Sequence, residues 1–425
     1  MRKIHNVLIA IFFIAVFASI AYMFNASSGI SSEALNYYNE GEAHFKNASV
    51  YDDLNDHNKA IDGYTQAIES FTKAIENSER FAAAYYKRGV VYDKRSSAYF
   101  IMKIEGRFYE RSLSDISRAT TDLSRAIRIE PDNTEFYLYR GKFYNRKFKR
   151  KEAIADFDKI IKIDPNFAEA YYHRAIAYEG LFGYKYEQAI ADLDKAIKID
   201  PNFTEAYNRR GDTYYINENY SKAIEDYSEA IKLQPHNSIF YQSRGKAYNN
   251  AGEYEKAIED YSKVIEINSS ITSFYFRAKA YYKLNEYEKA IADYTQSIED
   301  GSFIRFAYGE RGKVYYDIGE YEKAIADYSQ AMEIMSGGEP IDYYERARAY
   351  AALKKYDRAI EDYDKAINMY NLKLRTVNKQ ILAAAYCERA NVYANLGDIN
   401  KSKEDADKTR GIDYFGSEIY SKNCF

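Results

Sequence analysis

The sequence predicts an all-α solenoid in which antiparallel helix pairs follow one another along the chain. Three repeated features predict it, because a single helix pair cannot bury its apolar face alone but stacked pairs can. An arginine before Gly or Ala recurs at spacings that centre on about 34 residues, at Arg88, Arg140, Arg174, Arg210, Arg244, Arg277, Arg311, Arg346 and Arg389. The motif Ala-Ile-x-Asp follows seven of these arginines, with its alanine at Ala153, Ala189, Ala223, Ala257, Ala290, Ala324 and Ala359. A proline precedes four of them, at Pro131, Pro165, Pro201 and Pro235.

The spacing of apolar and small residues places each motif on its own helix. In one unit, Tyr207, Gly211 and Tyr214 fall three to four residues apart, on one face of a first helix. Ala223 and Tyr227 do the same on a second helix. We expect the small residues to let the two helices approach closely and the tyrosines to fill the space beside them. Proline between units suits a turn, because it cannot continue a helix.

Composition and charge narrow the class of protein. The 425 residues include 47 Tyr, only 5 Pro and no Trp, and the formal net charge is -4. A nearly balanced charge gives no reason to expect nucleic acid, which usually demands a basic face. It also excludes a strongly disordered polyanion.

The repeat resembles the tetratricopeptide repeat family. In the segment 204–235 the family's marked positions are Tyr207, Gly211, Tyr214, Ala223, Tyr227, Ala230 and Pro235. Tyr207 replaces the usual Trp and Arg210 the usual Leu, and neither change threatens the fold because the other marks stand. The resemblance covers about residues 34 to 410. It implies a right-handed superhelical solenoid of about ten units, preceded here by an N-terminal apolar helix.

The predicted domain organisation has three parts: residues 1–29 as a membrane anchor or signal segment, 30–412 as the solenoid, and 413–425 as a C-terminal tail. Within the solenoid the first unit is degenerate. Insertions are expected near 50–66 and 96–113, and an extended helix near 371–382. The last unit has a charged second helix, which suits a terminal cap that faces water.

The N-terminal segment predicts a membrane anchor. Arg2 and Lys3 precede an uncharged run from Val7 to Phe24, which as a helix would span roughly 27 Å, close to a bilayer core of about 30 Å. The basic flank predicts a cytoplasmic N-terminus. A cleaved signal peptide is the alternative, but the run is long and its candidate cleavage sites are poor. Either way the repeats are expected outside the cytoplasm, membrane-anchored in the first case and secreted or periplasmic in the second.

The two cysteines, Cys387 and Cys424, leave their pairing open. An exported protein could join them as a disulfide. Two isolated cysteines do not make a disulfide framework, so we expect unpaired thiols.

The sequence predicts no enzyme, no cofactor and no metal site. The five histidines have no partner at familiar metal-ligand spacing, and no Gly-rich phosphate loop precedes a helix. The acidic segment from Asp52 to His57 lacks the Gly and closing Glu of a calcium loop. We therefore expect no small-molecule substrate.

A second internal pattern predicts a ladder of ion pairs. In seven units the repeated arginine is followed sixteen residues later by an aspartate, as in Arg311 and Asp327. Insertions widen the spacing in Arg174/Asp192 and Arg88/Asp122. We predict that these arginines bind aspartates of the same or a neighbouring unit.

The resemblance also implies where a partner binds. In this family the first helices line a concave groove, and positions outside the family pattern contact the ligand. The groove would present Tyr172, Asn208, Arg209, Tyr215, Gln242, Asn249, Tyr275, Lys279, Tyr282, Lys313, Tyr316 and Arg348. Tyrosine, arginine and amide side chains suit a peptide-binding surface. The Lys and Asn set with which some members hold a partner's C-terminal carboxylate is not present.

The leading hypothesis is therefore a membrane-anchored, non-catalytic scaffold that binds a protein or peptide. Glycan binding by a Tyr-lined groove is the alternative, since ring faces can stack on sugars. Self-association through the segment 96–113 or the helices after Asn371 is a further alternative. An enzyme would need a cluster of perturbed titratable groups, and the sequence offers none.

Overall fold

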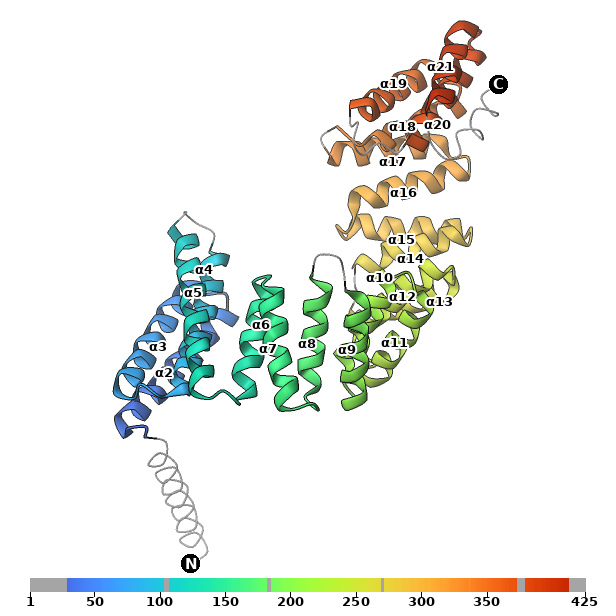
Figure 1. The fold of residues 1–425 in the computed structure, drawn as a ribbon. Coiled ribbons are helices and arrows are strands. Elements are labelled where there is room, and N and C mark those ends of the chain that lie inside the picture. The colour runs from blue at the N-terminus through green and yellow to red at the C-terminus, as the bar shows by residue number, and fades with distance from the viewer. Residues whose placement is uncertain are drawn as a thin grey trace, which may run out of the picture. The chain divides into compact units, whose positions relative to one another are not determined.

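The computed structural model describes residues 29–102, 107–181, 185–268, 271–335, 337–372 and 379–412. In these ranges every regular element is a helix, and the twenty helices form ten consecutive pairs (Figure 1). The predicted apolar helix at Val7–Phe24 and the tail 413–425 lie outside the described residues. None of the helices described is both long and apolar enough to cross a membrane.

The chain divides into two compact units, Met1–Ala206 and Tyr207–Phe425. The pairs of the first unit are α2 (Ser32–Asp53) with α3 (His57–Asn77), α4 (Ala82–Ile101) with α5 (Arg107–Ile129), α6 (Thr134–Arg146) with α7 (Arg150–Ile163), and α8 (Ala168–Glu179) with α9 (Tyr186–Ile199).

The second unit contains most of α10 (Thr204–Ile216), which pairs with α11 (Tyr220–Leu233). It continues with α12 (Ser238–Ala251) and α13 (Tyr254–Asn268), α14 (Ile271–Lys283) and α15 (Tyr287–Glu299), α16 (Ile304–Asp317) and α17 (Tyr321–Ile334), α18 (Pro340–Ala352) and α19 (Tyr356–Leu372), and α20 (Lys379–Asn395) and α21 (Ile399–Gly411).

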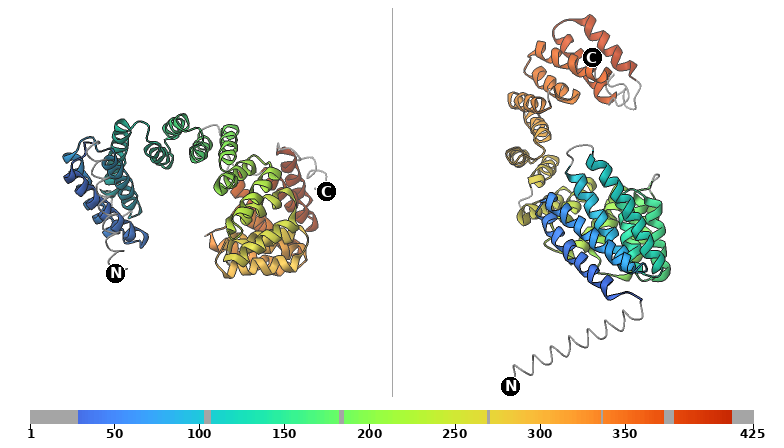
Figure 2. Two further views of the ribbon diagram at one scale, coloured as in Figure 1. Left: turned by 90° about the horizontal axis from the view of Figure 1, so that it is seen from below. Right: turned by 90° about the vertical axis from the view of Figure 1, so that its left-hand side faces the viewer.

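Packing follows chain order within each unit. Each first helix packs on its second helix, as Gly211 of α10 does on Tyr227 of α11, and that second helix packs on the first helix of the next pair. First helices of successive pairs also touch directly, as α14 does with α12 and α16. Two further views show the same stacking of neighbouring pairs (Figure 2). The first helices from α12 to α20 therefore form one continuous layer within the second unit, and a hydrogen bond from Asn250 to Tyr215 joins α10 to it.

The core is built from tyrosines of the second helices set against small residues of the first. Tyr227 and Tyr328 are 1% and 2% exposed. A Cβ at Gly211 would lie 2.8 Å from the ring of Tyr227, and one at Gly312 would lie 3.0 Å from the ring of Tyr328. The predicted close approach at Gly211 is confirmed, and glycine permits it because it lacks a Cβ.

The turn inside a pair is tight. Most of these turns contain one residue of positive φ, which is Gly at Gly252, Gly319 and Gly397 but another residue at Asn55, Phe148, Glu218, Asn285 and Lys354. All four predicted prolines lie in turns between pairs, as expected for a residue that cannot continue a helix.

The predicted ladder of arginine and aspartate is confirmed. In all nine pairs Nε and Nη2 of the arginine donate to the two carboxylate oxygens of one buried aspartate. The pairs are Arg88–Asp122, Arg140–Asp156, Arg174–Asp192, Arg210–Asp226, Arg244–Asp260, Arg277–Asp293, Arg311–Asp327, Arg346–Asp362 and Arg389–Asp405.

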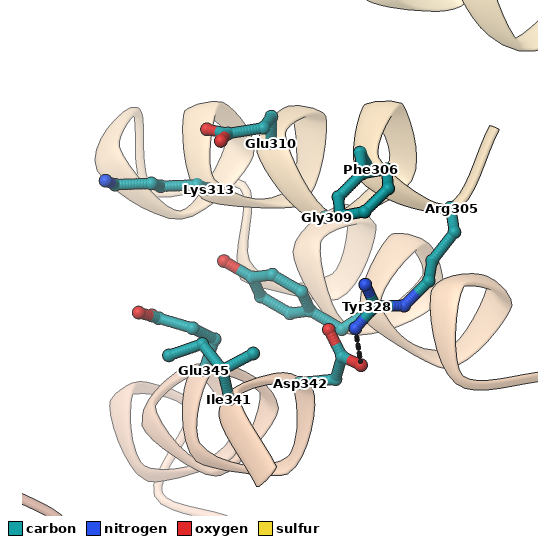
Figure 3. A pocket seen from close by; sticks show the side chains of 9 residues that line it. All are labelled: Arg305, Phe306, Gly309, Glu310, Lys313, Tyr328, Ile341, Asp342 and Glu345. Atoms are coloured by element: carbon teal, nitrogen blue, oxygen red, sulfur yellow. Dashed lines mark hydrogen bonds and ion pairs between the residues drawn. The ribbon is translucent and has the colours of Figure 1, made fainter. Parts of the chain in front are cut away.

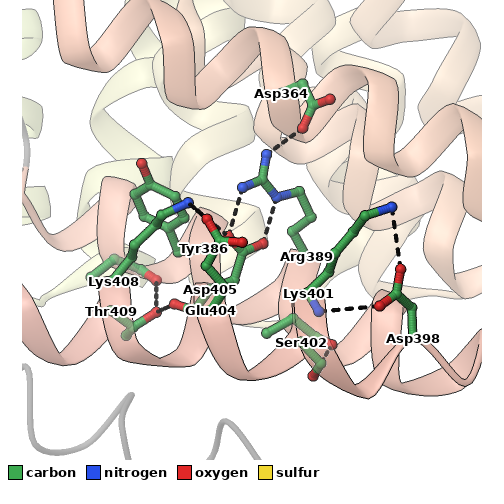
Figure 4. A network of polar contacts seen from close by, with 12 residues as sticks. Asp364, Tyr386, Arg389, Asp398, Lys401, Ser402, Glu404, Asp405, Lys408 and Thr409 are labelled. Atoms are coloured by element: carbon green, nitrogen blue, oxygen red, sulfur yellow. Dashed lines mark hydrogen bonds and ion pairs between the residues drawn. The ribbon is translucent and has the colours of Figure 1, made fainter.

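The third guanidinium nitrogen extends the ladder between pairs. Nη1 of Arg311 donates to Thr295 on the second helix of the preceding pair at 2.8 Å. Arg389 binds Asp364 of the preceding pair in the same way (Figure 4). Five other arginines repeat the bond to Ser or Thr, and Arg174 makes it to Asp158. Each of these arginines therefore joins three helices.

Three regions show how irregular sequence is accommodated. The stretch near 96–113 lengthens the α4 and α5 pair, where Arg95 binds Asp115 at 2.8 Å, although residues 103–106 lie outside the described ranges. Near 50–66, α2 ends at Asp53 and α3 begins at His57. Of the stretch 371–382, where an extended helix is predicted, α19 includes the residues up to Leu372 and α20 those from Lys379, and residues 373–378 lie outside the described ranges.

The cysteine prediction needs correction. Cys387 is 5% exposed and packs beside Ala406 of α21. It is disulfide-bonded, and no cysteine of the described chain is free. This differs from the unpaired thiols that the sequence favoured, since the spacing of two cysteines neither requires nor forbids a bond. Cys424 lies outside the described residues.

Candidate functional site

The predicted groove residues all lie on first helices. They are Tyr172 on α8, Asn208, Arg209 and Tyr215 on α10, Gln242 and Asn249 on α12, Tyr275, Lys279 and Tyr282 on α14, Lys313 and Tyr316 on α16, and Arg348 on α18. Tyr172 belongs to the first unit, where its ring packs on Phe203 at a centroid distance of 5.0 Å. The other eleven belong to the second unit, so the candidate site is built there.

Two asparagines of this layer hold buried acceptors that have no partner. Oδ1 of Asn208 and Oδ1 of Asn249 are buried and accept no hydrogen bond from any residue in the described ranges. The neighbouring amide of Asn250 is used, because its Nδ2 donates to the Tyr215 hydroxyl at 2.8 Å and joins α12 to α10. Most buried polar atoms in proteins are satisfied, so each exception needs an explanation.

The part of the layer on α12 and α14 is more closely packed than the sequence suggested. Tyr275 is 8% exposed and stacks on Phe303 at a centroid distance of 5.0 Å, so this side chain belongs to the core. Burial raises the pKa of Tyr275 to about 12. Lys279 lies over the Tyr275 ring at 5.7 Å, and Gln242 donates to Thr272 at 3.2 Å.

The residues on α14, α16 and α18 form contacts from one first helix to the next. The Tyr282 hydroxyl donates to Asp317 at 2.6 Å, and the Lys313 ammonium lies 5.4 Å from the centre of the Tyr282 ring. The Arg348 guanidinium lies 4.4 Å from the centre of the Tyr316 ring. Predicted groove residues are thus brought together along three successive first helices, α14, α16 and α18.

Arg348 also has a carboxylate partner. Its Nη1 donates to Oε2 of Glu345 at 2.8 Å, one turn away on α18. Although burial acts in the opposite direction, the negative charge of Glu345 raises the pKa of Arg348. Arg348 is therefore a fixed cation held between an aromatic ring and a carboxylate.

Sequence reasoning overlooked three carboxylates of the same layer. Glu310, Glu345 and Glu388 each stand directly before a ladder arginine, on α16, α18 and α20. Glu310 and Glu388 are partly buried, and neither forms a hydrogen bond or ion pair with any described residue. Burial raises the pKa of Glu388. The signal in the sequence is plain: the dipeptide Glu-Arg occurs at this place in the last three units and in no earlier one.

Sequence reasoning also took the second-helix tyrosines as packing alone. Tyr294, Tyr328 and Tyr363 are at most 2% exposed, yet their hydroxyls have no hydrogen-bond partner among the residues that the structure describes. The equivalent Tyr227 does have one, because it donates to Asp212 of α10 at 2.8 Å. The residues at the position of Asp212 in the later units are Lys279, Lys313 and Arg348. The later hydroxyls have therefore lost their acceptor.

A cavity opens beside one of these hydroxyls. It has a volume of about 290 Å³ and lies between α16, α17 and α18 (Figure 3). One wall includes Arg305, whose Nη2 donates to Asp342 at 3.0 Å while its buried Nε has no partner. The cavity is lined by Arg305, Phe306, Gly309, Glu310, Lys313, Tyr328, Ile341, Asp342 and Glu345.

The arrangement suits binding of an extended polar ligand. It combines partly exposed aromatic rings, fixed charges of both signs and buried polar atoms that lack partners. In the ranges that the structure describes, no three His, Cys, Asp or Glu side chains are placed to hold a metal ion.

Comparison with protein families decides the class. Tetratricopeptide repeat models match residues 134–167, 204–237, 238–270, 271–299, 303–375 and 383–408, and a TPR repeat model matches 185–217. The chain belongs to the tetratricopeptide repeat family. The predicted resemblance is confirmed, and membership supports a protein-interaction scaffold. Proteins of this family are generally non-catalytic.

Several solved structures are similar to parts of the chain. A crystal structure of MamA is 28% identical, with a TM-score of 0.35, and the match covers 39% of this chain and 96% of MamA. PilF of Pseudomonas aeruginosa is 19% identical, with a TM-score of 0.42, over 51% of this chain and 96% of PilF. A repeat protein of Parabacteroides merdae is 20% identical, with a TM-score of 0.41, over 62% of this chain and 98% of its own. A comparison with curated proteins gives no match.

Proposed function

We propose that this tetratricopeptide repeat protein is a scaffold whose second unit holds a peptide segment of a protein partner against the first helices. The layer from α10 to α18 provides the binding face. Its candidate side chains recur at fixed positions relative to the ladder arginine of each unit. They lie one or two residues before it, two residues after it, or five residues after it. These positions share one face of a helix because they lie three to four residues apart.

The observation that carries the proposal is a set of buried polar atoms that have no hydrogen-bond partner among the described residues, two on the first helices and three on the second helices packed against them. They are the side-chain oxygens of Asn208, Asn249, Tyr294, Tyr328 and Tyr363. A buried polar group without a hydrogen bond costs about 1–3 kcal/mol. A bound peptide would offset this cost, since every residue of an extended chain except proline presents both a donor and an acceptor.

We also propose that the repeats are held at a membrane, outside the cytoplasm. The basic residues Arg2 and Lys3 before the apolar run Val7–Phe24 support an uncleaved anchor. The disulfide-bonded state of Cys387 supports an oxidising compartment, where such bonds persist. Fusing a reporter enzyme that is active only outside the cytoplasm to the C-terminus tests this. An inactive reporter on a stable fusion would contradict it.

The binding proposal is tested by removing the unpaired hydroxyls alone. The variant Tyr294→Phe/Tyr328→Phe/Tyr363→Phe keeps the rings and deletes three atoms that contribute no hydrogen bond within the described chain. It should fold as well as the wild type. Both proteins are crosslinked in intact cells of the native host, and the captured proteins are identified by mass spectrometry.

We expect a discrete partner protein with the wild type and its strong depletion with the triple variant. The matched control is Tyr37→Phe/Tyr51→Phe/Tyr254→Phe, the same chemical change at partly exposed tyrosines outside the proposed binding face. Equal recovery of partners by wild type and triple variant would show that the first-helix layer is not the binding face. Recovery of glycan alone would replace protein binding with glycan binding.

A further inference from the structure

The cavity between α16, α17 and α18 has a polar centre that its own walls do not satisfy. Tyr328 lies at its base, 2% exposed, and within the described part of the chain its hydroxyl has no hydrogen-bond partner. In Figure 3 this hydroxyl points into the space between Glu310 on α16 and Glu345 on α18. An atom placed there would therefore meet one hydroxyl and two carboxyl groups.

The two carboxylates beside this space differ in how many partners they already have. Glu310 forms no hydrogen bond or ion pair with any described residue, so its negative charge has no direct partner. Glu345 accepts from Arg348 through one oxygen, Oε2, and its other oxygen remains for a ligand. The negative charge of Glu345 contributes to a raised pKa of Tyr328, after the larger effect of burial.

The cations of the cavity are held away from its two free carboxyl groups. Arg305 pairs with Asp342 through Nη2 at 3.0 Å, and its buried Nε has no partner among the described residues. In Figure 3 the Arg305 guanidinium lies on the Asp342 side of the Tyr328 ring, away from the Tyr328 hydroxyl and Glu310. Lys313 is exposed, and its ammonium lies over the Tyr282 ring on the neighbouring helix at 5.4 Å. In Figure 3 the Lys313 ammonium extends away from the Tyr328 ring. A carboxylate ligand would consequently face Glu310 and Glu345 without a free cation at its centre.

The walls also suit an alkyl chain or a flat cationic group. Phe306 is 52% exposed, with the Arg305 guanidinium 5.1 Å from the centre of its ring, and Ile341 lies on the opposite helix. A guanidinium or ammonium attracts an aromatic face and donates to carboxylates. Phosphate or carboxylate ligands gain nothing from these contacts.

We propose that this cavity receives a basic side chain, arginine or lysine, of the bound partner segment. The inference rests on the proposed function and adds the chemistry of the partner. The side chain donates to Glu310, to the free oxygen of Glu345 and to the Tyr328 hydroxyl oxygen, while its alkyl part packs on Phe306. One basic group of the partner then binds both the Glu310 carboxylate and the Tyr328 hydroxyl.

The test measures sequence preference, since the partner is unidentified. The full chain in detergent is applied to an array of acetylated random dodecapeptides, and the frequencies of Arg and Lys are compared with those of Asp and Glu among bound sequences. We expect at least one position at which basic residues are enriched about tenfold, the scale of a charge-assisted hydrogen bond. In Glu310→Gln and in Glu310→Gln/Glu345→Gln this enrichment should largely disappear while peptides still bind.

Two further variants separate the pocket from general charge effects. Glu322→Gln/Glu333→Gln removes two exposed carboxylates from α17 of the same helix pair and should leave the preference unchanged. Lys313→Gln should strengthen the preference for basic residues by about threefold, because it removes a nearby like charge. If the pocket instead bound carboxylates, Lys313→Gln would weaken the preference for acidic residues.

The outcomes distinguish this inference from the proposed function. Peptides that bind without basic enrichment, or with enrichment that the Gln variants keep, would overturn the inference and leave the scaffold in place. An equal loss in the Glu322→Gln/Glu333→Gln control would overturn it as well. Failure of the wild type to bind any peptide would overturn both proposals.

Discussion

Arg311 donates from Nε and Nη2 to the two carboxylate oxygens of Asp327, at 2.7 and 2.8 Å. Asp327 is 5% exposed, so this bidentate pair lies inside the stack and is little screened by solvent. Its repetition in nine units gives the solenoid an internal polar ladder. A bidentate pair has a defined geometry as well as energy, so the ladder fixes how each second helix is oriented against its first helix.

Breaking one rung should destabilise the second unit strongly. Asp327→Ala leaves the Arg311 guanidinium buried without its carboxylate, and we expect a loss of about 3–5 kcal/mol in the free energy of unfolding. Urea unfolding followed by circular dichroism measures it. The control Glu320→Ala removes an exposed pair with Lys323 at 3.3 Å and should change stability by less than about 1 kcal/mol. Similar losses in both variants would contradict a structural ladder.

Two glycines of α16 should respond oppositely to alanine. Gly312→Ala places a Cβ 3.0 Å from the Tyr328 ring, so we expect a loss of about 1–3 kcal/mol from overpacking. Gly309→Ala meets nothing within 4 Å and should gain roughly 0.5–1 kcal/mol from lower backbone entropy in the unfolded chain. Thermal unfolding of the two variants and the wild type measures whether each substitution lowers or raises stability. A gain at Gly312 would show that the helices can separate freely there.

Removing a tyrosine hydroxyl should have different effects at equivalent positions. Tyr328→Phe deletes an atom without a partner and should be neutral or stabilising. Tyr227→Phe removes the donor to Asp212 and should lose about 1 kcal/mol. Unfolding free energies of the two variants at one pH make the comparison. Equal losses would mean that the Tyr328 hydroxyl is satisfied in solution.

The Glu388 carboxyl should make stability depend on pH in an unusual direction. Burial raises its folded pKa above the ordinary value of 4.5, so the folded state binds the proton more tightly than the unfolded chain. The ionised group therefore opposes folding at neutral pH, and this effect fades as pH falls through the raised pKa towards 4.5. Glu388→Gln should raise the melting temperature at pH 7 and lose that advantage near pH 4.5.

The control for this prediction has the opposite sign. The Glu404 carboxylate, hydrogen-bonded to Lys408, has a lowered pKa, so Glu404→Gln should not raise the melting temperature at pH 7. Melting curves of both variants between pH 7 and 4 compare the two behaviours. A Glu388→Gln protein that melts below the wild type at pH 7 would show that this carboxylate has a stabilising partner.

The repeating parts of the fold were predictable because the residues that contact one another recur at the same spacing in successive units. Arg311 and Asp327 recur with their fixed spacing in seven units, and the spacing alone indicated that the groups meet. Gly211 beside Tyr227 was predictable for the same reason. Such positions depend on neighbours within one or two helix pairs, which the period of the sequence supplies.

The candidate site was less predictable because its properties depend on differences between units. The Tyr328 hydroxyl lacks a partner only because Lys313 stands where Asp212 stands in an earlier unit. Tyr275 is buried because Phe303, in a left-handed turn with φ 48°, places its ring against it. The first relationship holds only in the units of Tyr294, Tyr328 and Tyr363, so a pattern common to all units gave no signal for it. The Glu-Arg dipeptides did give a signal. Their glutamates lie outside the family pattern, on the first helices, and could have been predicted as part of the site.

The central claim is that a partner protein contacts the first helices of the second unit, and site-specific photocrosslinking tests it most directly. A photoreactive amino acid replaces Lys313 on α16 in one protein and Lys323 on α17 in another, both of which are exposed. The cells are irradiated and crosslinked species are separated by size. We expect a discrete crosslinked protein from position 313 and none from position 323. The same adduct from both positions, or an adduct from position 323 alone, would contradict binding at the first-helix layer.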